Sequence, residues 1–308
     1  MSKTAAYGYL GPAGTFCHEA LLTLPDLPGH LRPYPSVVAA LEAVRNEDVA
    51  ATLVPIENSI EGGVSATLDN LTYGRPLMIT REVLLPVEFN LCGRPGTRLK
   101  DVKRIVTHPH AAAQCREWVN TNLPQATVHE GGSTAAGAAE VADPHSKFQA
   151  TICSSAAGEM HKLEALATAI ADNKEAVTRF ILVTKPGTPT ERTGADKTTL
   201  TVFLRDDEAG ALLRMLEQFA SRGVNLSRIE SRPSRLVRGH YSFSIDAEGH
   251  INDHRMAGAI KGLKRTSREV TFLGSYPRAD QLRPEVGNGH SDESYRAAEE
   301  WLRNLRQR

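Results

Sequence analysis

The stretch Thr178-Arg179-Phe180-Ile181-Leu182-Val183 decides how this sequence is organised. Its last four residues form an apolar run that predicts a buried β-strand, and a polar pair stands directly before that run. A hydroxyl on a rigid element can donate a hydrogen bond to a departing oxygen, and a neighbouring guanidinium can bind a carboxylate through two parallel bonds. The stretch therefore suggests chemistry at a strand end, although an ordinary strand start with a solvated arginine would read the same way.

Residues 5–185, which contain this stretch, alternate short β runs with helical stretches. The expected strands are 6–10, 51–56, 77–85, 87–91, 104–107, 126–129, 150–153 and 180–184. The expected helices are 15–24, 36–46, 65–73, 109–121, 133–142 and 155–163. Such alternation is typical of an α/β domain with a mostly parallel sheet. The sequence leaves open whether the strands form one sheet or two lobes.

Five of the expected strands run directly into Gly, Ser, Thr or Asn at a helix start. These junctions are 11–16, 57–63, 108–110, 130–134 and 154–155. Such residues cap the free N–H groups of a helix, and the same groups bind anions. Because ligands of open α/β sheets lie beyond the carboxyl ends of the strands, the loops predict a site for a small anionic ligand. Neither a Walker loop nor GxGxxG is present, which disfavours a nucleotide.

Length, charge and cysteine usage restrict the classes of protein. The 308 residues suggest about two domains, and equal numbers of basic and acidic residues, 36 of each, give no general attraction to nucleic acid or an anionic membrane. Four widely spaced cysteines disfavour a disulfide framework and fit a reduced cytosol. No apolar run of membrane-spanning length and no secretion signal are recognisable, so we expect a cytoplasmic protein. His108 and His110 lack a carboxylate or cysteine at ligand spacing, so no metal is expected.

The rest of the chain predicts a second domain. Residues 186–197 are polar with two Pro and two Gly, and are typical of a linker. Strands are expected at 198–204, 224–231, 240–247 and 270–276, and helices at 210–222 and 255–264. The order βαββαβ indicates a ferredoxin-like fold. The proposed division is 1–185, linker 186–197, 198–278 and a tail 279–308, whose helix 291–308 has an apolar stripe expected to dock on this protein or a neighbour.

Five motifs in order resemble the prephenate dehydratases. They are Gly11-Pro12-Ala13-Gly14-Thr15-Phe16, the loop from Pro55-Ile56-Glu57-Asn58-Ser59 to Gly63, His108-Pro109 through Gln114-Cys115, Ser133-Thr134-Ala135, and Thr178-Arg179-Phe180. The chain departs from the family pattern at two positions. Cys17 stands where the family usually has Ser, and His110 where it often has Gln.

The resemblance implies a two-lobed α/β domain like the type II periplasmic binding proteins. It implies a carbon–oxygen lyase that converts prephenate to phenylpyruvate, water and carbon dioxide in L-phenylalanine biosynthesis, without a cofactor. The residues implied to be catalytic are Thr178, Asn58 and Gln114, and those implied to bind substrate are Thr15, Ser59, Ser133, Thr134, Arg179 and Phe180. A protein that binds a small anion or an amino acid without chemistry is the alternative.

The second domain resembles the ACT domain of the same enzymes through Gly210-Ala211-Leu212 and Glu230-Ser231-Arg232-Pro233. The resemblance implies an allosteric L-phenylalanine site between two subunits, and hence a homo-oligomer, either dimer or tetramer. The residues implied to form it are Gly210, Ala211, Leu212, Asn225, Leu226, Glu230, Ser231 and Arg232. Feedback inhibition by that amino acid is expected. An ACT-containing sensor that acts on DNA is disfavoured by the balanced charge and by the absence of a helix-turn-helix pattern.

Overall fold

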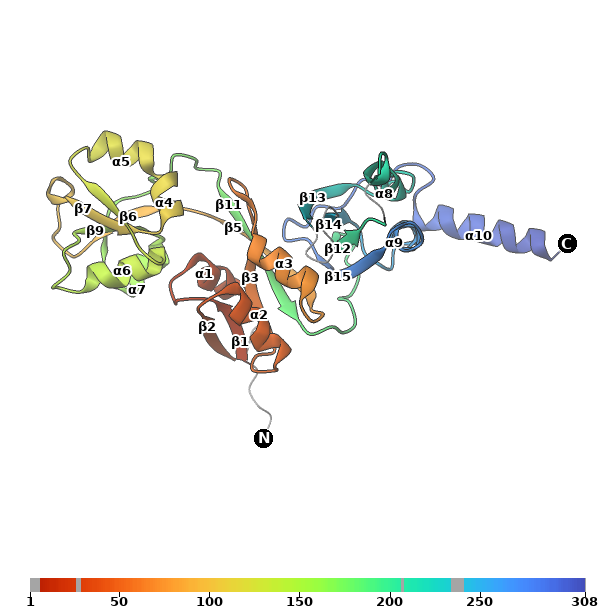
Figure 1. Ribbon diagram of the computed structural model, residues 1–308, viewed down its shortest axis with the longest axis horizontal. Coiled ribbons are helices and arrows are strands. Elements are labelled where there is room, and N and C mark those ends of the chain that lie inside the picture. Colours follow the sequence, from red (N-terminus) through yellow and green to blue (C-terminus); the bar gives the residue numbers. More distant parts are fainter. Residues whose placement is uncertain (1–5, 26–28, 206–207, 234–240, 308) are drawn as a thin grey trace. The chain divides into compact units, whose positions relative to one another are not determined.

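The computed structural model describes residues 6–25, 29–205, 208–233 and 241–307 (Figure 1). The chain divides into two compact units, Met1–Thr67 with Val83–Phe180, and Leu68–Glu82 with Ile181–Arg308. The division runs through three elements, α3 (Ser65–Tyr73), β5 (Met78–Pro86) and β11 (Val177–Thr184). Each of these elements therefore belongs partly to both units.

The first sheet has the strand order β2-β1-β3-β11-β5, with β4 paired to β3. The remaining elements here are β1 (Ala6–Leu10), β2 (His30–Tyr34), β3 (Ala51–Asn58), β4 (Gly62–Gly63), α1 (Phe16–Leu22) and α2 (Val37–Arg45). β1 pairs in parallel with both β2 and β3, and β4 turns back antiparallel on β3. The carboxyl ends of β1 and β3 consequently open at the same edge, as the sequence predicted.

The second sheet of the same unit has the order β10-β6-β9-β7-β8. Its strands are β6 (Asn90–Gly93), β7 (Arg104–Thr107), β8 (Thr127–Glu130), β9 (Ala150–Cys153) and β10 (Glu164–Ala167), and its helical segments are η1 (Leu99–Asp101), α4 (Pro109–Gln114), α5 (Arg116–Asn122), α6 (Thr134–Ala142) and α7 (Ser155–Met160). Helices α4 and α5 pack on one face and α6 and α7 on the other (Figure 1), each over its own cluster of buried apolar side chains. The unit is thus two α/β lobes.

Several details differ from the expectation of a mostly parallel sheet. β6 pairs antiparallel with both β9 and β10. β2 went unpredicted because it is a largely exposed edge strand that contains a proline, and β10 because its sequence Glu-Ala-Leu-Ala favours a helix. The expected helix 109–121 is interrupted at Cys115, whose φ of −119° ends α4 and begins α5.

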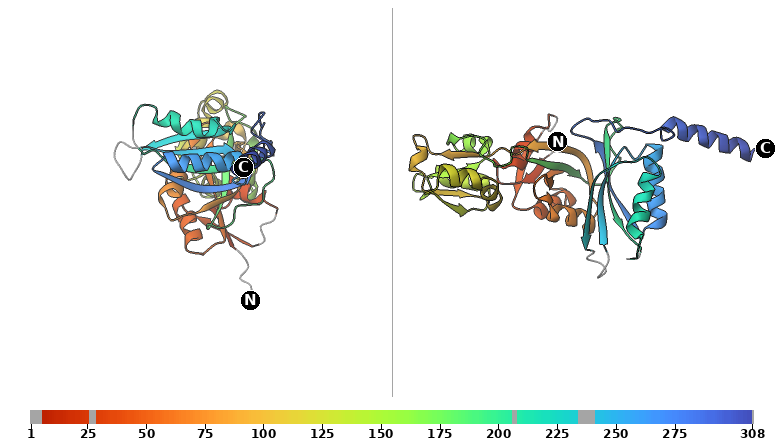
Figure 2. Two further views of the ribbon diagram at one scale, coloured as in Figure 1. Left: turned by 90° about the vertical axis from the view of Figure 1, so that its right-hand side faces the viewer. Right: turned by 90° about the horizontal axis from the view of Figure 1, so that it is seen from above.

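The second unit contains an antiparallel sheet of order β13-β14-β12-β15. Its elements are β12 (Asp196–Phe203), α8 (Ala211–Ala220), β13 (Leu226–Pro233), β14 (Tyr241–Glu248), α9 (His254–Thr266) and β15 (Glu269–Pro277). Helices α8 and α9 cover one face of the sheet (Figure 2), over a core that includes Leu200, Phe219 and Ile245. The βαββαβ plan is confirmed, although His240, the first residue of one expected strand, lies outside the described residues.

The opposite face of this sheet is polar and carries residues 68–82. Lys197 Nζ lies 2.9 Å from Glu82 Oε2 in a buried ion pair, and Arg232 Nε lies 2.7 Å from Asp69 Oδ1. The strand β12 begins at Asp196, inside the range 186–197 that the sequence suggests as a linker, because the buried charges there have partners. The division into domains at 185, 197 and 278 stays a prediction.

The C-terminal helix α10 (Asp292–Arg306) contacts the rest of its unit through its first half, where Glu299 Oε1 lies 3.7 Å from His254 Nδ1. Asp292 pairs with Arg192 at 2.7 Å, and the Tyr295 ring stacks on His254 of α9. No described residue of α10 is buried, and Trp301 remains 64% exposed. Docking of its apolar stripe stays a prediction. Within the described ranges, no helix is long and apolar enough to cross a membrane.

Candidate active site

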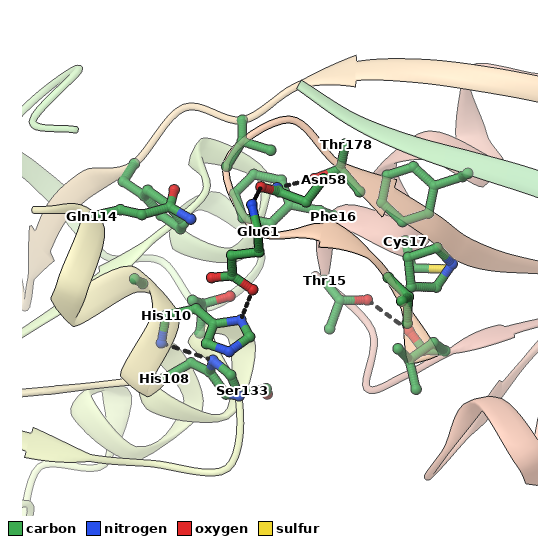
Figure 3. A pocket seen from close by; sticks show the side chains of 18 of the residues that line it. Thr15, Phe16, Cys17, Asn58, Glu61, His108, His110, Gln114, Ser133 and Thr178 are labelled. Atoms are coloured by element: carbon green, nitrogen blue, oxygen red, sulfur yellow. Dashed lines mark hydrogen bonds and ion pairs between the residues drawn. The ribbon is translucent and has the colours of Figure 1, made fainter. Parts of the chain in front are cut away.

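A pocket of about 410 Å³ opens between the two lobes of the first unit (Figure 3). Its walls come from the strand-end loops that the sequence singled out, together with apolar side chains such as Phe16 and Phe89. Of the residues predicted to act on substrate, Thr15, Asn58, Gln114, Ser133, Thr134, Thr178 and Phe180 line it. Five chain segments that are distant in sequence are therefore brought together around one small volume.

Thr178 and Asn58 both line this pocket and are joined by a hydrogen bond. The Asn58 side-chain amide Nδ2 donates to Thr178 Oγ1 at 2.9 Å (Figure 3). The amide is oriented in turn, because its Oδ1 accepts from the backbone N–H groups of Ile60 and Glu61 at 2.9 and 3.3 Å. This is an Asx turn at the end of β3. The Thr178 hydroxyl thus accepts from a fixed donor, and its own proton stays available to another acceptor.

Ser59 fixes the same loop to β11 and does not line the pocket. Its hydroxyl accepts from the Val177 N–H at 3.0 Å, and its own N–H donates to the Val177 carbonyl at 2.9 Å. These two bonds hold the Asn58 loop against the residue that precedes Thr178. The geometry gives Ser59 a supporting role in place of the substrate contact that the resemblance implied.

Arg179 also lies away from the pocket. Successive residues of a strand point to opposite faces, so Thr178 and Phe180 line the pocket while Arg179 points elsewhere. Its buried guanidinium lies 3.5 Å from Glu57 Oε2. The carboxylate contact predicted for Arg179 has no support in this geometry.

Gln114 brings an acceptor without a partner. It ends α4 and lines the pocket, and its Oε1 is buried with no hydrogen bond among the described residues. Leaving a buried amide oxygen unpaired costs free energy. A donor group on a bound ligand would remove that cost.

The predicted helix caps are present. Thr15 Oγ1 accepts from the His18 N–H and also lies 3.0 Å from the Leu10 carbonyl oxygen. Ser133 Oγ accepts from the Ala136 N–H at 3.0 Å at the start of α6. Both hydroxyls face the pocket while satisfying the helices that they begin.

Cys17, the first departure from the family pattern, is structural. Its thiol is buried and donates to the Leu53 carbonyl at 3.2 Å. Burial raises the pKa of this thiol to about 12, so the thiolate needed for nucleophilic chemistry is not formed near neutral pH.

Glu61, His108 and His110 also line the pocket, although the sequence reasoning gave them no contact with substrate. Glu61 Oε2 lies 3.0 Å from His110 Nδ1 (Figure 3). His108 caps α4, because its Nδ1 accepts from the His110 N–H, and burial lowers the pKa of its imidazole. Glu61 lies in the family motif that runs from Pro55 to Gly63, and this position is the feature of the sequence that could have indicated a role for it. The distance in sequence between Glu61 and His110 concealed their pairing.

The residues implied to bind an amino acid lie on α8 and β13 of the second unit. Gly210 has φ +85° and precedes α8, but the Ala211 N–H already donates to the Glu208 carbonyl at 3.1 Å. Leu212 is exposed on α8, and β13 is an edge strand of its sheet.

The ends of β13 differ in what their side chains contact. At its start, Leu226 packs partly on the core, and the carbonyl of Asn225 just before it accepts from the Glu248 N–H. Further along, Glu230 lies beside Arg228 and Arg232, while Ser231 is exposed.

Comparison with known proteins agrees with this arrangement. The sequence model of the prephenate dehydratase family matches residues 7–188, and that of the ACT domain matches residues 198–265. The prephenate dehydratase of Amycolatopsis methanolica is 40% identical over 98% of this chain and 97% of its own. That of Mycobacteroides abscessus is 44% identical over 88% of this chain and 89% of its own.

A solved structure agrees in fold along the whole chain. The crystal structure of the prephenate dehydratase of Arthrobacter aurescens in complex with L-Phe superposes with a TM-score of 0.94, at 49% identity, over 99% of this chain and 100% of that one. With its motifs gathered around one pocket and its relatives aligned along nearly its full length, the chain belongs to the prephenate dehydratase family.

Proposed function

We propose that the two-lobed unit performs the family's dehydration in the pocket around Thr178. Prephenate is a cyclohexadiene with two carboxylates and a ring hydroxyl. The bond between the ring and its carboxylate breaks, and carbon dioxide leaves. The electron pair of that bond enters the ring. The ring hydroxyl departs and, with one proton added, becomes water. Phenylpyruvate remains. Because the product ring is aromatic, the protein has only to orient the two leaving groups and to assist the departing oxygen.

The observation that carries this proposal is the hydrogen bond from Asn58 to Thr178. Since the amide donates to the hydroxyl oxygen, the Thr178 proton is directed to the leaving oxygen of the substrate. A donor to an oxygen that gains charge in the transition state stabilises that state more than the bound substrate. Thr178 is therefore the catalytic donor, and Asn58 is its positioning residue.

The other pocket groups bind and orient substrate through neutral hydrogen bonds. Gln114 Oε1 accepts from a hydroxyl of the substrate, which is supported by its burial without a partner. Ser133 and Thr134 supply further hydroxyl donors, Thr15 offers its hydroxyl oxygen because its proton is donated to the Leu10 carbonyl, and Phe180 packs on the ring. No cofactor is needed for this chemistry.

Release of phenylpyruvate, detected by the absorbance of its enolate in base, tests the activity. Wild type is expected to produce it from prephenate, and Thr178→Ala is expected to lose about 10²–10⁴-fold in kcat, the usual contribution of one proton donor. Thr178→Ser should retain more activity. Binding of prephenate without turnover would favour the alternative of a small-anion binding protein.

We further propose that L-phenylalanine binds the second unit and lowers activity. The complex of the Arthrobacter relative with L-Phe supports this, as do the open strand edge of β13 and the exposed Leu212. Two such units paired at this edge would form a cleft, with Leu212 and Leu226 around the aromatic ring and carbonyls of 225–231 on the ammonium. The protein is then a homo-oligomer, at least a dimer.

Titration of L-phenylalanine against wild type and against a Glu230→Ala, Ser231→Ala double variant tests the regulation. A coupling free energy of about 1–3 kcal/mol would weaken prephenate binding 5- to 150-fold, and the double variant should lose that response while keeping its turnover. Unchanged inhibition in the variant would put the regulatory site elsewhere.

The division of the chain into domains at 1–185, 186–197, 198–278 and 279–308 is part of the same proposal.

A cytoplasmic location is also proposed, and the four free cysteines support it, all of them buried. Cell fractionation, with periplasmic and cytoplasmic marker proteins as controls, tests this location.

A further inference from the structure

The charge of the pocket does not match that of its substrate. Prephenate carries two carboxylates, yet the residues that line the pocket include no lysine and no arginine among the described ones. Arg179 lies next to Glu57 instead. Glu61 is the one carboxylate on the lining as far as the structure describes it, and it repels a dianion. The groups that can become cationic there are the imidazoles of His108 and His110.

The two imidazoles are not equivalent. The Nδ1 of His108 accepts a hydrogen bond from the backbone N–H of His110. Burial, together with the neighbouring imidazole, lowers the pKa of His108, which favours its neutral form. The His110 side chain is 62% exposed and has Glu61 at 3.0 Å from its Nδ1. No partner for its Nε2 is present in the part of the chain that the structure describes. His110 is thus held at one ring nitrogen and open at the other (Figure 3).

We propose that the imidazolium of His110, held by Glu61, is the cationic group that binds a carboxylate of the substrate through Nε2–H. The inference rests on the proposed function and extends it, because it names the group that recognises the anion. Glu61 comes from the loop between β3 and β4 and His110 from α4, so the pair joins the two lobes at the pocket mouth. The charged groups facing His110 are Glu61 and His108, and His108 also experiences Glu61 and Glu130.

The reaction selects which carboxylate this is. The ring carboxylate loses its charge as carbon dioxide, so a cation on it would stabilise the bound substrate more than the transition state and slow the reaction. The carboxylate of the pyruvyl side chain keeps its charge throughout. His110 therefore binds the retained carboxylate, and its contribution is equal in substrate, transition state and product.

Steady-state kinetics of His110→Gln test this assignment, since glutamine is the residue that the resembling motif often has here. We expect KM for prephenate to rise about tenfold, as for the loss of one charge-assisted hydrogen bond, with kcat changed less than about twofold. The inhibition constant of phenylpyruvate should rise by the same factor, because the product retains this carboxylate. An unchanged inhibition constant with a raised KM would assign His110 to the ring carboxylate and overturn the proposal.

His145→Gln, an exposed histidine away from the pocket, is the matched control and should keep the wild-type KM. An equal rise of KM in His145→Gln and His110→Gln would overturn the assignment.

A double-mutant cycle separates direct binding from mere neutralisation of Glu61. If His110 contacts substrate, His110→Gln should still raise KM severalfold in a Glu61→Gln background. Restoration of the wild-type KM in the double variant would mean that His110 only screens Glu61, and would overturn the proposal. If only the inference about His110 is wrong, the wild-type protein still turns over prephenate. If the wild-type protein forms no phenylpyruvate, the proposed function is rejected and this inference with it.

Discussion

Replacing Asn58 by aspartate changes one donor and little else. Aspartate keeps an oxygen that can accept from the Ile60 and Glu61 N–H groups, so the turn at the end of β3 should survive. Its second oxygen stands where the amide Nδ2 now donates to Thr178. Because a carboxylate only accepts, the Thr178 hydroxyl would have to turn and donate to residue 58, and its proton would be lost to the substrate.

The size of the effect follows from that geometry. The donor lost to the leaving oxygen corresponds to 10²–10⁴-fold in kcat, or about 2.7–5.4 kcal/mol of transition-state stabilisation. The folded state exchanges a neutral bond at 2.9 Å for a charge-assisted one, so its free energy of unfolding should change by less than about 1 kcal/mol. Asn58→Asp should therefore have a near-native melting temperature and very low kcat. KM is expected to rise too, because the added charge repels a dianion.

The measurement is kcat at saturating prephenate, read as enolate absorbance of phenylpyruvate, beside thermal unfolding. Asn122→Asp is the matched control, since it makes the same change on α5 away from the pocket, at a side chain that donates only to the Trp118 carbonyl. A kcat within threefold of wild type in Asn58→Asp, with the fold intact, would refute the role given to the Thr178 proton.

The remaining predictions concern single positions. Gln114→Met should lower kcat/KM about 10- to 100-fold without lowering the melting temperature, because the buried oxygen it removes has no partner; a lower melting temperature would make Gln114 structural. Cys17→Ser should keep its turnover, since serine can donate to the same carbonyl, and an inactive variant would indicate thiol chemistry. Lys197→Met should cost about 3 kcal/mol in denaturant unfolding by leaving Glu82 buried without its cation, whereas the exposed control Lys100→Met should cost almost nothing.

Local patterns in the sequence predicted most of the elements and the members of the pocket. Helix 65–73 and strands 6–10, 104–107 and 150–153 match the structure residue for residue, because their apolar patterns agree with their environment. Thr178 and Asn58 were predicted through motifs, and a hydrogen bond joins them in the structure. Strand alternation, which can be read from the sequence, puts Arg179 on the face opposite to Thr178 and Phe180.

Other features depend on distances that a sequence does not contain. The contact between Glu61 and His110 joins loops of different lobes, and no local pattern encodes it. In the same way, Lys197 reads as part of a polar linker until Glu82 is seen beside it. From sequence alone, an isolated charged residue is expected at the surface. The fold shows the opposite charge that offsets the free-energy cost of burying it.

The placement of residues 68–82 also determines how the protein unfolds. In sequence these residues lie between two segments of the first unit, yet they belong to the second unit, where Asp69 pairs with Arg232 and Glu82 with Lys197 of its sheet. Cutting the chain after residue 185 would thus expose a polar face and leave a buried carboxylate without its cation. We therefore expect that the second unit does not fold as a fragment cut at residue 185, and that calorimetry records one cooperative transition with equal calorimetric and van't Hoff enthalpies. Two resolved transitions would instead mean that the halves melt independently.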